Sequence, residues 1–588
     1  MKSQFTAKEH IAPIDGLRAL AVIAVLLFHL GLTWIPGGFL GVDLFFAISG
    51  YVITRLILDS IETRNALDLR QFYLARVRRL FPALLFLALG STLFIAALAP
   101  DAIHRFLSDL PYVFTGTNNW RLVALHQDYF QAVGRPPLLQ HTWSLAVEAQ
   151  FYLIWPIILY LIWRYLGKSR IAPVALAISF ISGAALFIFS VNSDKASAGS
   201  ISHVYFGSDT HSLGLFLGSA LAVSWIPRNL SPQISQRAQD FIDGIGLIGL
   251  AGLILLFFVV TESNTTLYRI AFPLAAVFAC ATLTSIVHPA SRIAHFFRNR
   301  LLLWIGQRSY GIYLWHWVIF QISRPSVDLA SSSLLALNLA RVLLVFALSD
   351  ISMRYIEIPF RRGIIQNWLR GMKYRAVAIR KNQRIFLVIT SLLILTISGS
   401  ATATALYRDA RAPKILKEEI TTSSAQPNQR LKGIWLTGDS IILGSKIKLS
   451  QQYPLALINA RVGRQIQELT DVVKADISQV STNTVVLDLG NNNHLTRESV
   501  VTLLDLLKNQ PHIILVNTAV PRVWKDDNNQ IIAEESAKYP NLVLVDWNAI
   551  SANHPEFFTP DGVHLNDKGS DVYVAAIVDA LKSVGVTE

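Results

Sequence analysis

Four short blocks in the last third of the chain carry side chains that could together activate a serine. In chain order, the residues are Ser440, Gly463, Asn492, Asp561 and His564. A serine becomes a nucleophile when a neighbouring histidine accepts its proton, and a carboxylate can hold that histidine in the required tautomer. The spacing predicts Ser440 as the nucleophile, His564 as its base and Asp561 as the triad acid.

The remaining residues of these blocks could stabilise negative charge. The backbone N–H groups of Ser440 and Gly463 and the side-chain amide of Asn492 are donors that could bind the oxyanion of a tetrahedral intermediate. We expect Asp439 to form hydrogen bonds within the Gly-Asp-Ser turn rather than to serve as the acid. Such a tripeptide alone more often marks an ordinary loop serine, and it is the combination with the later blocks that is specific.

A second set of ionisable residues lies within apolar runs near the N-terminus. Arg18 and His29 are eleven positions apart in one run, so on a helix they share a face and lie about 16 Å apart along the axis. Ionisable groups inside a membrane are costly unless they face a polar cavity, which favours a functional role. The alternative is an arginine that reaches the membrane surface and an unrelated buried histidine.

Further polar side chains interrupt other apolar runs. They are Asp43, Ser49, Arg76, Arg78, Arg79, His141, Ser144, Glu148, His316 and Glu357. The three arginines stand at the expected start of a helix, where forked guanidinium groups could hold phosphates. Because such a cluster is also typical of a membrane anchor, the arginines alone do not decide between the two interpretations.

The composition excludes disordered, fibrous and ordinary soluble proteins. The 588 residues are 52% hydrophobic and only 15% charged, which indicates many membrane spans. Apolar runs long enough to span a bilayer recur at eleven places, at residues 17–33, 39–59, 80–100, 151–167, 171–190, 210–226, 243–261, 268–287, 310–323, 334–353 and 385–405. No signal-peptide cleavage site is apparent after the first run, so we expect it to stay in the membrane.

The formal charge of +13 belongs to the apolar part of the chain. Residues 421–588 hold 14 Lys and Arg against 18 Asp and Glu, and the preceding residues hold 38 against 21. The expected cytoplasmic loops carry 24 Lys and Arg and the opposite loops carry five. The positive-inside rule therefore predicts a cytoplasmic N-terminus and an outer C-terminal domain. We expect no nucleic-acid binding, because no basic stripe interleaved with aromatic residues is apparent.

The C-terminal part predicts an α/β domain. After a polar linker at 407–430, apolar runs at 454–459, 484–489, 512–517 and 542–546 alternate with helical patterns such as 497–508 and 568–584. This alternation favours a parallel sheet between two helical layers, with reactive groups at the carboxyl ends of the strands. The single cysteine, Cys280, excludes an internal disulfide and a cysteine-built zinc site, and we expect no metal site.

The membrane part resembles the acyltransferase-3 family of membrane O-acyltransferases over about residues 10–365. The resemblance lies in Arg18 and His29, in the GVDLFFAISGY stretch that starts at residue 41 and in the SLAVEAQFY stretch that starts at residue 144. It implies that Arg18 and His29 are essential. The residues that it implies to bind the donor or to shape its site are Asp43, Arg76, Arg79, Ser144 and Glu148.

Two positions depart from that family's pattern. The usual paired glutamates read Glu148-Ala149, and a site near the sixth span where relatives often carry arginine reads His211. Neither departure touches Arg18 or His29, but each leaves the role of its own position open.

The C-terminal blocks resemble the SGNH hydrolase family over about residues 430–585. An acyltransferase-3 part of ten spans (1–370), an extra helix and linker (371–430) and an SGNH-like domain (431–588) together resemble the fused O-acetyltransferases of bacterial envelope glycans. The implied activity moves acetyl from cytoplasmic acetyl-CoA to a hydroxyl of a membrane-linked glycan. Lipopolysaccharide O-antigen is the first expectation for the acceptor, and peptidoglycan is the alternative.

The resemblance also implies a setting and leaves other functions open. We expect a multi-pass protein of the bacterial inner membrane with a periplasmic C-terminal domain, whose partners are acetyl-CoA, the glycan and the lipid bilayer. No permanently bound cofactor is expected. A membrane-anchored glycan O-acetylesterase is a further alternative. A transporter is less favoured, because no internal inverted repeat is apparent.

Overall fold

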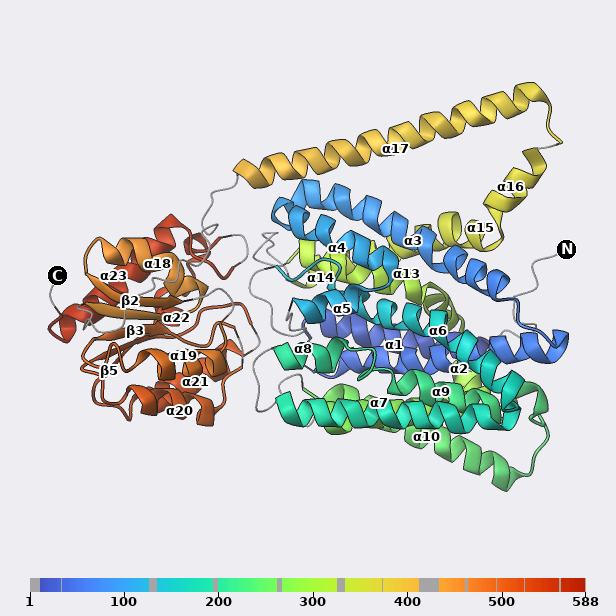
Figure 1. Ribbon diagram of the computed structural model, residues 1–588, viewed down its shortest axis with the longest axis horizontal. Coiled ribbons are helices and arrows are strands. Elements are labelled where there is room, and N and C mark those ends of the chain that lie inside the picture. Colours follow the sequence, from blue (N-terminus) through green and yellow to red (C-terminus); the bar gives the residue numbers. More distant parts are fainter. Residues whose placement is uncertain are drawn as a thin grey trace. The chain divides into compact units, whose positions relative to one another are not determined.

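The computed structural model describes two compact units, which divide near residue 410. The described residues are 11–32, 34–125, 135–193, 199–261, 267–324, 334–372, 374–411, 433–460, 464–492, 494–522, 524–559 and 562–586. The first unit is helical and the second contains a parallel sheet (Figure 1). This division between a multi-span helical part and an α/β domain confirms the predicted fold class.

The helical unit is built from long apolar helices joined by shorter ones. Its longer helices are α1 (Ala12–His29), α2 (Gly41–Arg64), α3 (Leu69–Leu98), α4 (Ile103–Thr115), α6 (Trp143–Tyr165), α7 (Ile171–Ser193), α9 (Leu213–Ser224), α10 (Gln236–Val259), α11 (Phe272–Val287), α13 (Arg300–Ile322), α14 (Leu334–Ile351) and α17 (Val377–Arg411). Its shorter helices include α5 (Asn118–Ala124), α8 (Gly199–Phe206), α15 (Ile358–Arg361) and α16 (Ile364–Met372).

Nine helices among the described residues are long and apolar enough to cross a membrane. They correspond to nine of the eleven predicted spans. The other two predicted spans fall on α9, which has 12 residues, and on α13, which has 23. Both of these helices pack inside the unit, α9 against α2 and α13 against α1. The total of eleven spans therefore stays a prediction.

Two helices begin earlier than the apolar runs suggested. The α1 helix starts at Ala12 and ends at His29, because Gly31 adopts a left-handed conformation just beyond the helix. The α3 helix starts at Leu69, where the Asp68 side chain caps its N-terminus by accepting from the backbone N–H of Gln71. Consequently the Arg76–Arg79 cluster lies within a helix rather than at its entrance.

Close approach of α1 to α13 brings the polar residues of these helices together. A Cβ atom on Gly306 of α13 would lie 1.8 Å from the backbone oxygen of Asp15, so only glycine fits there. The α13 helix is buried along most of its length from Ile305 to Phe320. Polar side chains on its inner faces therefore lie in the centre of the unit, where they must find partners.

The C-terminal unit contains a five-stranded parallel sheet with the strand order β2-β1-β3-β4-β5. The strands are β1 (Ile434–Gly438), β2 (Leu455–Ala460), β3 (Val485–Asp488), β4 (Ile513–Val516) and β5 (Leu542–Val545), and the helices are α18 (Ser440–Ser450), α19 (Ile466–Asp476), α20 (Arg497–Leu507), α21 (Lys525–Ser536), α22 (Trp547–Ile550) and α23 (Asp567–Ser583). The order reverses direction at β1, so β1 and β3 lie at a switch point where α/β proteins place their sites.

Helices cover both faces of this sheet. Leu436 and Val486 pack with residues of α18 and α23 on one face, whereas Trp435 and Val485 pack with residues of α19 and α20 on the other. This arrangement follows from the alternation of side chains along a strand. Because both hydrophobic clusters lie within residues 434–586, we expect residues 411–588 to fold on their own.

Candidate active sites

Ser440 stands at the carboxyl end of β1 as the first residue of α18. Gly438 adopts a φ of 146° in the turn, and the Asp439 side chain caps the helix by accepting from the backbone N–H of Ile441. The Nε2 atom of His564 lies 2.9 Å from the Ser440 Oγ atom. The structure thus brings together the predicted nucleophile and base, and it confirms the turn-forming role expected of Asp439.

His564 is held by the loop that leads into α23. Its backbone oxygen accepts from the N–H of Thr559 at 2.7 Å, and Phe558 and Leu565 form an antiparallel bridge beside it. Asn566 then caps α23 by accepting from the backbone N–H of Gly569. The predicted acid, Asp561, and the predicted oxyanion donor, Gly463, lie outside the described residues.

Asn492, the other predicted oxyanion donor, joins two blocks of the site. Its side-chain amide donates to Asp439 Oδ2 at 2.6 Å and to the Arg464 backbone oxygen at 3.1 Å. In this structure the amide therefore holds the Gly-Asp-Ser turn against the loops that follow β2 and β3. Its contact with an oxyanion stays a prediction.

Asp488, the last residue of β3, supports the same turn and was not predicted from the sequence. Its carboxyl oxygens accept from the backbone N–H of Asp439 at 2.8 Å and from that of Ile442 at 3.3 Å. Burial raises the pKa of Asp488 well above its ordinary value, and the nearby charge of Asp439 adds to the effect. The sequence signal that could have identified Asp488 is a lone aspartate at the end of the apolar strand VVLD.

The helical unit contains a small cavity whose lining includes six of the polar residues named from the sequence. Its polar lining consists of Arg18, Ser49, Arg76, Arg79, Ser144, Glu148, Tyr152, Ser309, Tyr310 and Tyr313. Glu148 accepts from Ser49 Oγ at 2.6 Å and from the Tyr152 hydroxyl at 3.0 Å, and it lies within electrostatic range of Arg18 and Arg79. Glu148 thus lies near arginines from two different helices, Arg18 of α1 and Arg79 of α3.

A larger cavity of about 580 Å³ adjoins the small one, and Arg18 and Arg79 line both. It lies at the end of the unit where α1 begins. The arginines of this larger cavity are Arg18, Arg55, Arg79, Arg228 and Arg361. Its carboxylates, Asp15 and Asp59, are fewer. Arg55, Arg228 and Arg361 form ion pairs with Asp59, Glu62 and Glu357. The guanidinium groups of Arg18 and Arg79 are therefore the better placed to bind a negatively charged ligand.

His29 lies at the other end of α1, where it meets His316 of α13. Its Nδ1 atom is 3.1 Å from Nε2 of His316. The sequence pointed to each histidine separately but gave no sign that they pair. The predicted residue Ser144 lies near this region, where its hydroxyl is 2.7 Å from that of Tyr313.

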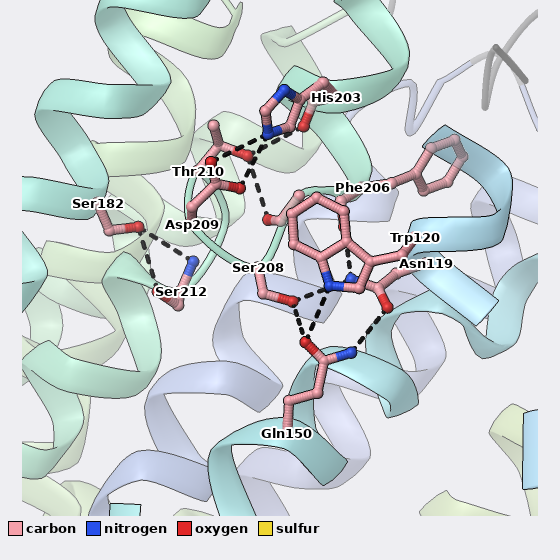
Figure 2. A network of polar contacts seen from close by, with 11 residues as sticks. Asn119, Trp120, Gln150, Ser182, His203, Phe206, Ser208, Asp209, Thr210 and Ser212 are labelled. Carbon is pink, nitrogen blue, oxygen red and sulfur yellow. Dashed lines mark hydrogen bonds and ion pairs between the residues drawn. The ribbon is translucent and has the colours of Figure 1, made fainter. Parts of the chain in front are cut away.

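Asp43 pairs with His211, the position that departs from the family pattern. Asp43 Oδ1 is 3.1 Å from His211 Nε2, and the other ring nitrogen, Nδ1, lies 2.7 Å from the Tyr205 backbone oxygen. The loop that carries His211 is fixed on both sides, by Ser208 to Gln150 of α6 and by Ser212 to Ser182 of α7 (Figure 2). His211 thus links the buried Asp43 carboxyl to the Tyr205 backbone oxygen.

Comparison with known proteins identifies the family. The model of the acyltransferase-3 family, described as an acyltransferase domain, matches residues 11–352. The chain belongs to this family. It is an acyltransferase enzyme of the membrane O-acetyltransferase type with a C-terminal α/β domain.

Three relatives match this acyltransferase over nearly its whole length. Peptidoglycan O-acetyltransferase OatA of Listeria monocytogenes is 31% identical over 98% of this chain and 99% of its own. A putative O-acetyltransferase of Staphylococcus aureus is 33% identical over 99% and 98%. The putative peptidoglycan O-acetyltransferase YrhL of Bacillus subtilis is 30% identical over 98% and 99%.

Among solved structures, the C-terminal catalytic domain of Streptococcus pneumoniae OatA, determined with a methylsulfonyl adduct, is similar to the C-terminal α/β domain. It is 24% identical, with a TM-score of 0.25, and the match covers 27% of this acyltransferase and 98% of that domain.

Gly438→Ala is expected to destabilise the acyltransferase's C-terminal unit by about 2–5 kcal/mol, because the added Cβ would be strained and crowded. It would lie 2.0 Å from Asp488 Oδ1 at a φ that disfavours any side chain. Thermal unfolding of residues 411–588 measures the change. Gly444→Ala in α18 is the matched control, since its Cβ would meet nothing within 4 Å, and it is expected to stabilise by about 0.5–1 kcal/mol. Equal stabilities for the two variants would contradict this account of the turn.

The raised pKa of Asp488 makes the stability of the same unit depend on pH. The folded state keeps a proton that the unfolded state has released, so the free energy of unfolding falls as the pH rises from the ordinary aspartate value through the raised one. Thermal unfolding of residues 411–588 between about pH 4 and about pH 9 should show a smaller fall for Asp488→Asn. Asp579→Asn on the exposed face of α23 should leave the wild-type slope. An unchanged slope in Asp488→Asn would show that this carboxyl does not titrate there.

Proposed function

We propose that this protein transfers acetyl from cytoplasmic acetyl-CoA, across the membrane, to hydroxyl groups of peptidoglycan. The observation that carries the proposal is the Ser440–His564 pair, with 2.9 Å between Oγ and Nε2, in a chain with an arginine-lined membrane cavity. Two full-length relatives bear the name of a peptidoglycan O-acetyltransferase. They favour the alternative acceptor over the lipopolysaccharide O-antigen that the sequence placed first.

The larger cavity is the proposed site of the donor. Coenzyme A carries three phosphates, and the cavity offers the guanidinium groups of Arg18 and Arg79, beside three further arginines that are paired with carboxylates. The positive-inside count favours a cytoplasmic position for this end of the unit, where acetyl-CoA is available. The small cavity beyond Arg18 and Arg79 then leads the acetyl end of the donor towards the interior of the helical unit.

The outer domain completes the transfer by two ester exchanges at Ser440. His564 Nε2 takes the Ser440 proton while Oγ bonds to the acetyl carbon, and the group that carried the acetyl leaves with that proton. In the second exchange His564 deprotonates a sugar hydroxyl, the sugar oxygen takes the acetyl, and the proton returns to Ser440. The Ser440 backbone N–H is the proposed oxyanion donor in both exchanges.

An acetylesterase is the second candidate function, because a serine–histidine pair on this fold can equally pass the acetyl to water. An assay of purified full-length protein in liposomes, supplied with acetyl-CoA and peptidoglycan fragments, distinguishes a transferase from an esterase. We expect fragments that are one acetyl group heavier by mass spectrometry, and no gain on O-antigen fragments. Faster release of acetate than formation of acetylated fragments would favour the esterase. Acetylation of O-antigen alone would overturn the peptidoglycan assignment.

A further inference from the structure

His29 and His316 face one another across the interface between α1 and α13. The Nδ1 atom of His29 lies 3.1 Å from the Nε2 atom of His316, and the ring centroids are 5.0 Å apart. His316 is fully buried, whereas His29 is partly exposed. The distance fits one N–H···N hydrogen bond, so one ring must donate and the other must accept.

Backbone carbonyls decide which ring donates. The Nδ1 atom of His316 lies 2.7 Å from the Tyr313 oxygen and 3.2 Å from the Ile312 oxygen. Carbonyl oxygens only accept, so neutral His316 carries its proton on Nδ1 and its Nε2 accepts. The facing Nδ1 of His29 must therefore carry a proton. In neutral His29 this leaves Nε2 as the basic nitrogen.

We propose that His316 is a positioning residue that holds His29 in the tautomer and orientation required for acetyl transfer. This inference rests on the proposed function. In the transfer, Nε2 of His29 takes the proton of an attacking hydroxyl while its oxygen bonds to the acetyl carbon. The carbon–sulfur bond breaks, and the departing thiolate of coenzyme A takes up that proton. His316 acts on His29 as the third member of a triad acts on a catalytic histidine.

Other contacts of His29 limit how far the loss of His316 should disturb the orientation of its ring. Its hydrogen bond to the backbone oxygen of Val25, one helical turn earlier, and its edge-on contact with Trp317 at 4.9 Å also restrain the ring. The titratable groups that act on His29 are His316 and His141. Loss of His316 should therefore weaken the alignment of the ring without releasing it.

His141 provides a matched control. Like His316 it is fully buried, and its ring lies 5.8 Å from that of His316. Its Nε2 atom, however, is 3.1 Å from the backbone oxygen of Leu314 rather than bonded to His29. A variant at His141 therefore disturbs the packing of the same region without removing the acceptor of His29.

Steady-state transfer by full-length protein in liposomes, with acetyl-CoA as the varied substrate, tests the inference. His316→Phe should lower kcat about 10- to 100-fold with KM for acetyl-CoA changed less than about twofold. His316→Gln, whose amide oxygen can accept from His29, should stay within about fivefold of wild type, and His141→Phe within about threefold. Equal losses in His316→Phe and His141→Phe, no rescue by glutamine, or an effect confined to KM would each overturn the inference.

A spectroscopic measurement separates this inference from the proposed function. Wild-type protein that transfers no acetyl would overturn the proposed function but would not test the histidine contact. Solid-state NMR of ¹⁵N-histidine-labelled protein in lipid bilayers tests it directly. We expect a nitrogen–nitrogen coupling across the hydrogen bond, with the proton on His29 Nδ1, and its disappearance in His316→Phe. Absence of the coupling in wild type, or a proton on His29 Nε2 alone, would overturn the inference whether or not acetyl is transferred.

Discussion

Replacing Ser440 by alanine is expected to lower acetyl transfer to peptidoglycan fragments at least about 1,000-fold, because the variant has no oxygen to carry the acetyl ester. The hydroxyl lies 2.9 Å from His564 Nε2, so its loss also leaves that base without its proton donor. Transfer by the full-length protein in liposomes measures the effect. Hydrolysis of p-nitrophenyl acetate by residues 411–588 should fall in parallel, since the same serine would carry that acetyl.

Ser445→Ala is the matched control for this experiment. Ser445 lies five residues further along α18, is equally buried at 1% exposed, and donates its hydroxyl to the Ile442 backbone oxygen at 2.8 Å. The control should keep transfer within about twofold, because the loss of one hydroxyl there costs only about 1 kcal/mol of stability. Full acetylation by Ser440→Ala would show that acetyl reaches the glycan without an ester on Ser440.

The sequence predicted the elements of both units well, because each carries a strong local pattern. The predicted runs at 484–489 and 512–517 correspond to β3 and β4, and both strands belong to the parallel sheet. The same patterns misplaced helix ends. The first turns of α3 are polar, so an apolar count starts near residue 80, whereas the helix begins where Asp68 caps it.

Within the candidate sites, only the residues that stand in recognisable sequence motifs were predictable. Ser440 and His564 stand in recognisable blocks, and the structure places them together. The contact between His29 and His316 joins residues 287 positions apart, and no spacing rule could reveal it. The role of Asp488 depends on the approach of β3 to the turn after β1, which a single carboxylate in an apolar strand does not specify.

Which charged residues share the small cavity was likewise not predictable from the sequence alone. A shared helical face was predictable for Arg18 and His29 from their separation of eleven residues. The close approach of Arg18, Arg79 and Glu148 was not, because it depends on how α1, α3 and α6 pack around one cavity. Sequence reasoning thus identified the charged groups, and packing decided which of them share a cavity.

His29→Ala is expected to lower transfer from acetyl-CoA about 100- to 10,000-fold, the range typical of the loss of a general base. Hydrolysis of p-nitrophenyl acetate at Ser440 should be unchanged, because the two residues belong to separate units. Full-length protein in liposomes, assayed for both reactions, measures the two activities on one sample. His29→Ala should therefore lose transfer and keep hydrolysis, whereas Ser440→Ala should lose both activities.

His104→Ala controls for the loss of an imidazole from the helical unit. The His104 side chain is 63% exposed and pairs with Asp409 at 3.3 Å, so this variant should transfer acetyl within about twofold of wild type. Retained transfer in His29→Ala would remove His29 from the reaction and would leave Arg18, Arg79 and Glu148 as the groups that act on the acetyl donor. Loss of both activities in His29→Ala would instead indicate that the two units depend on one another for folding.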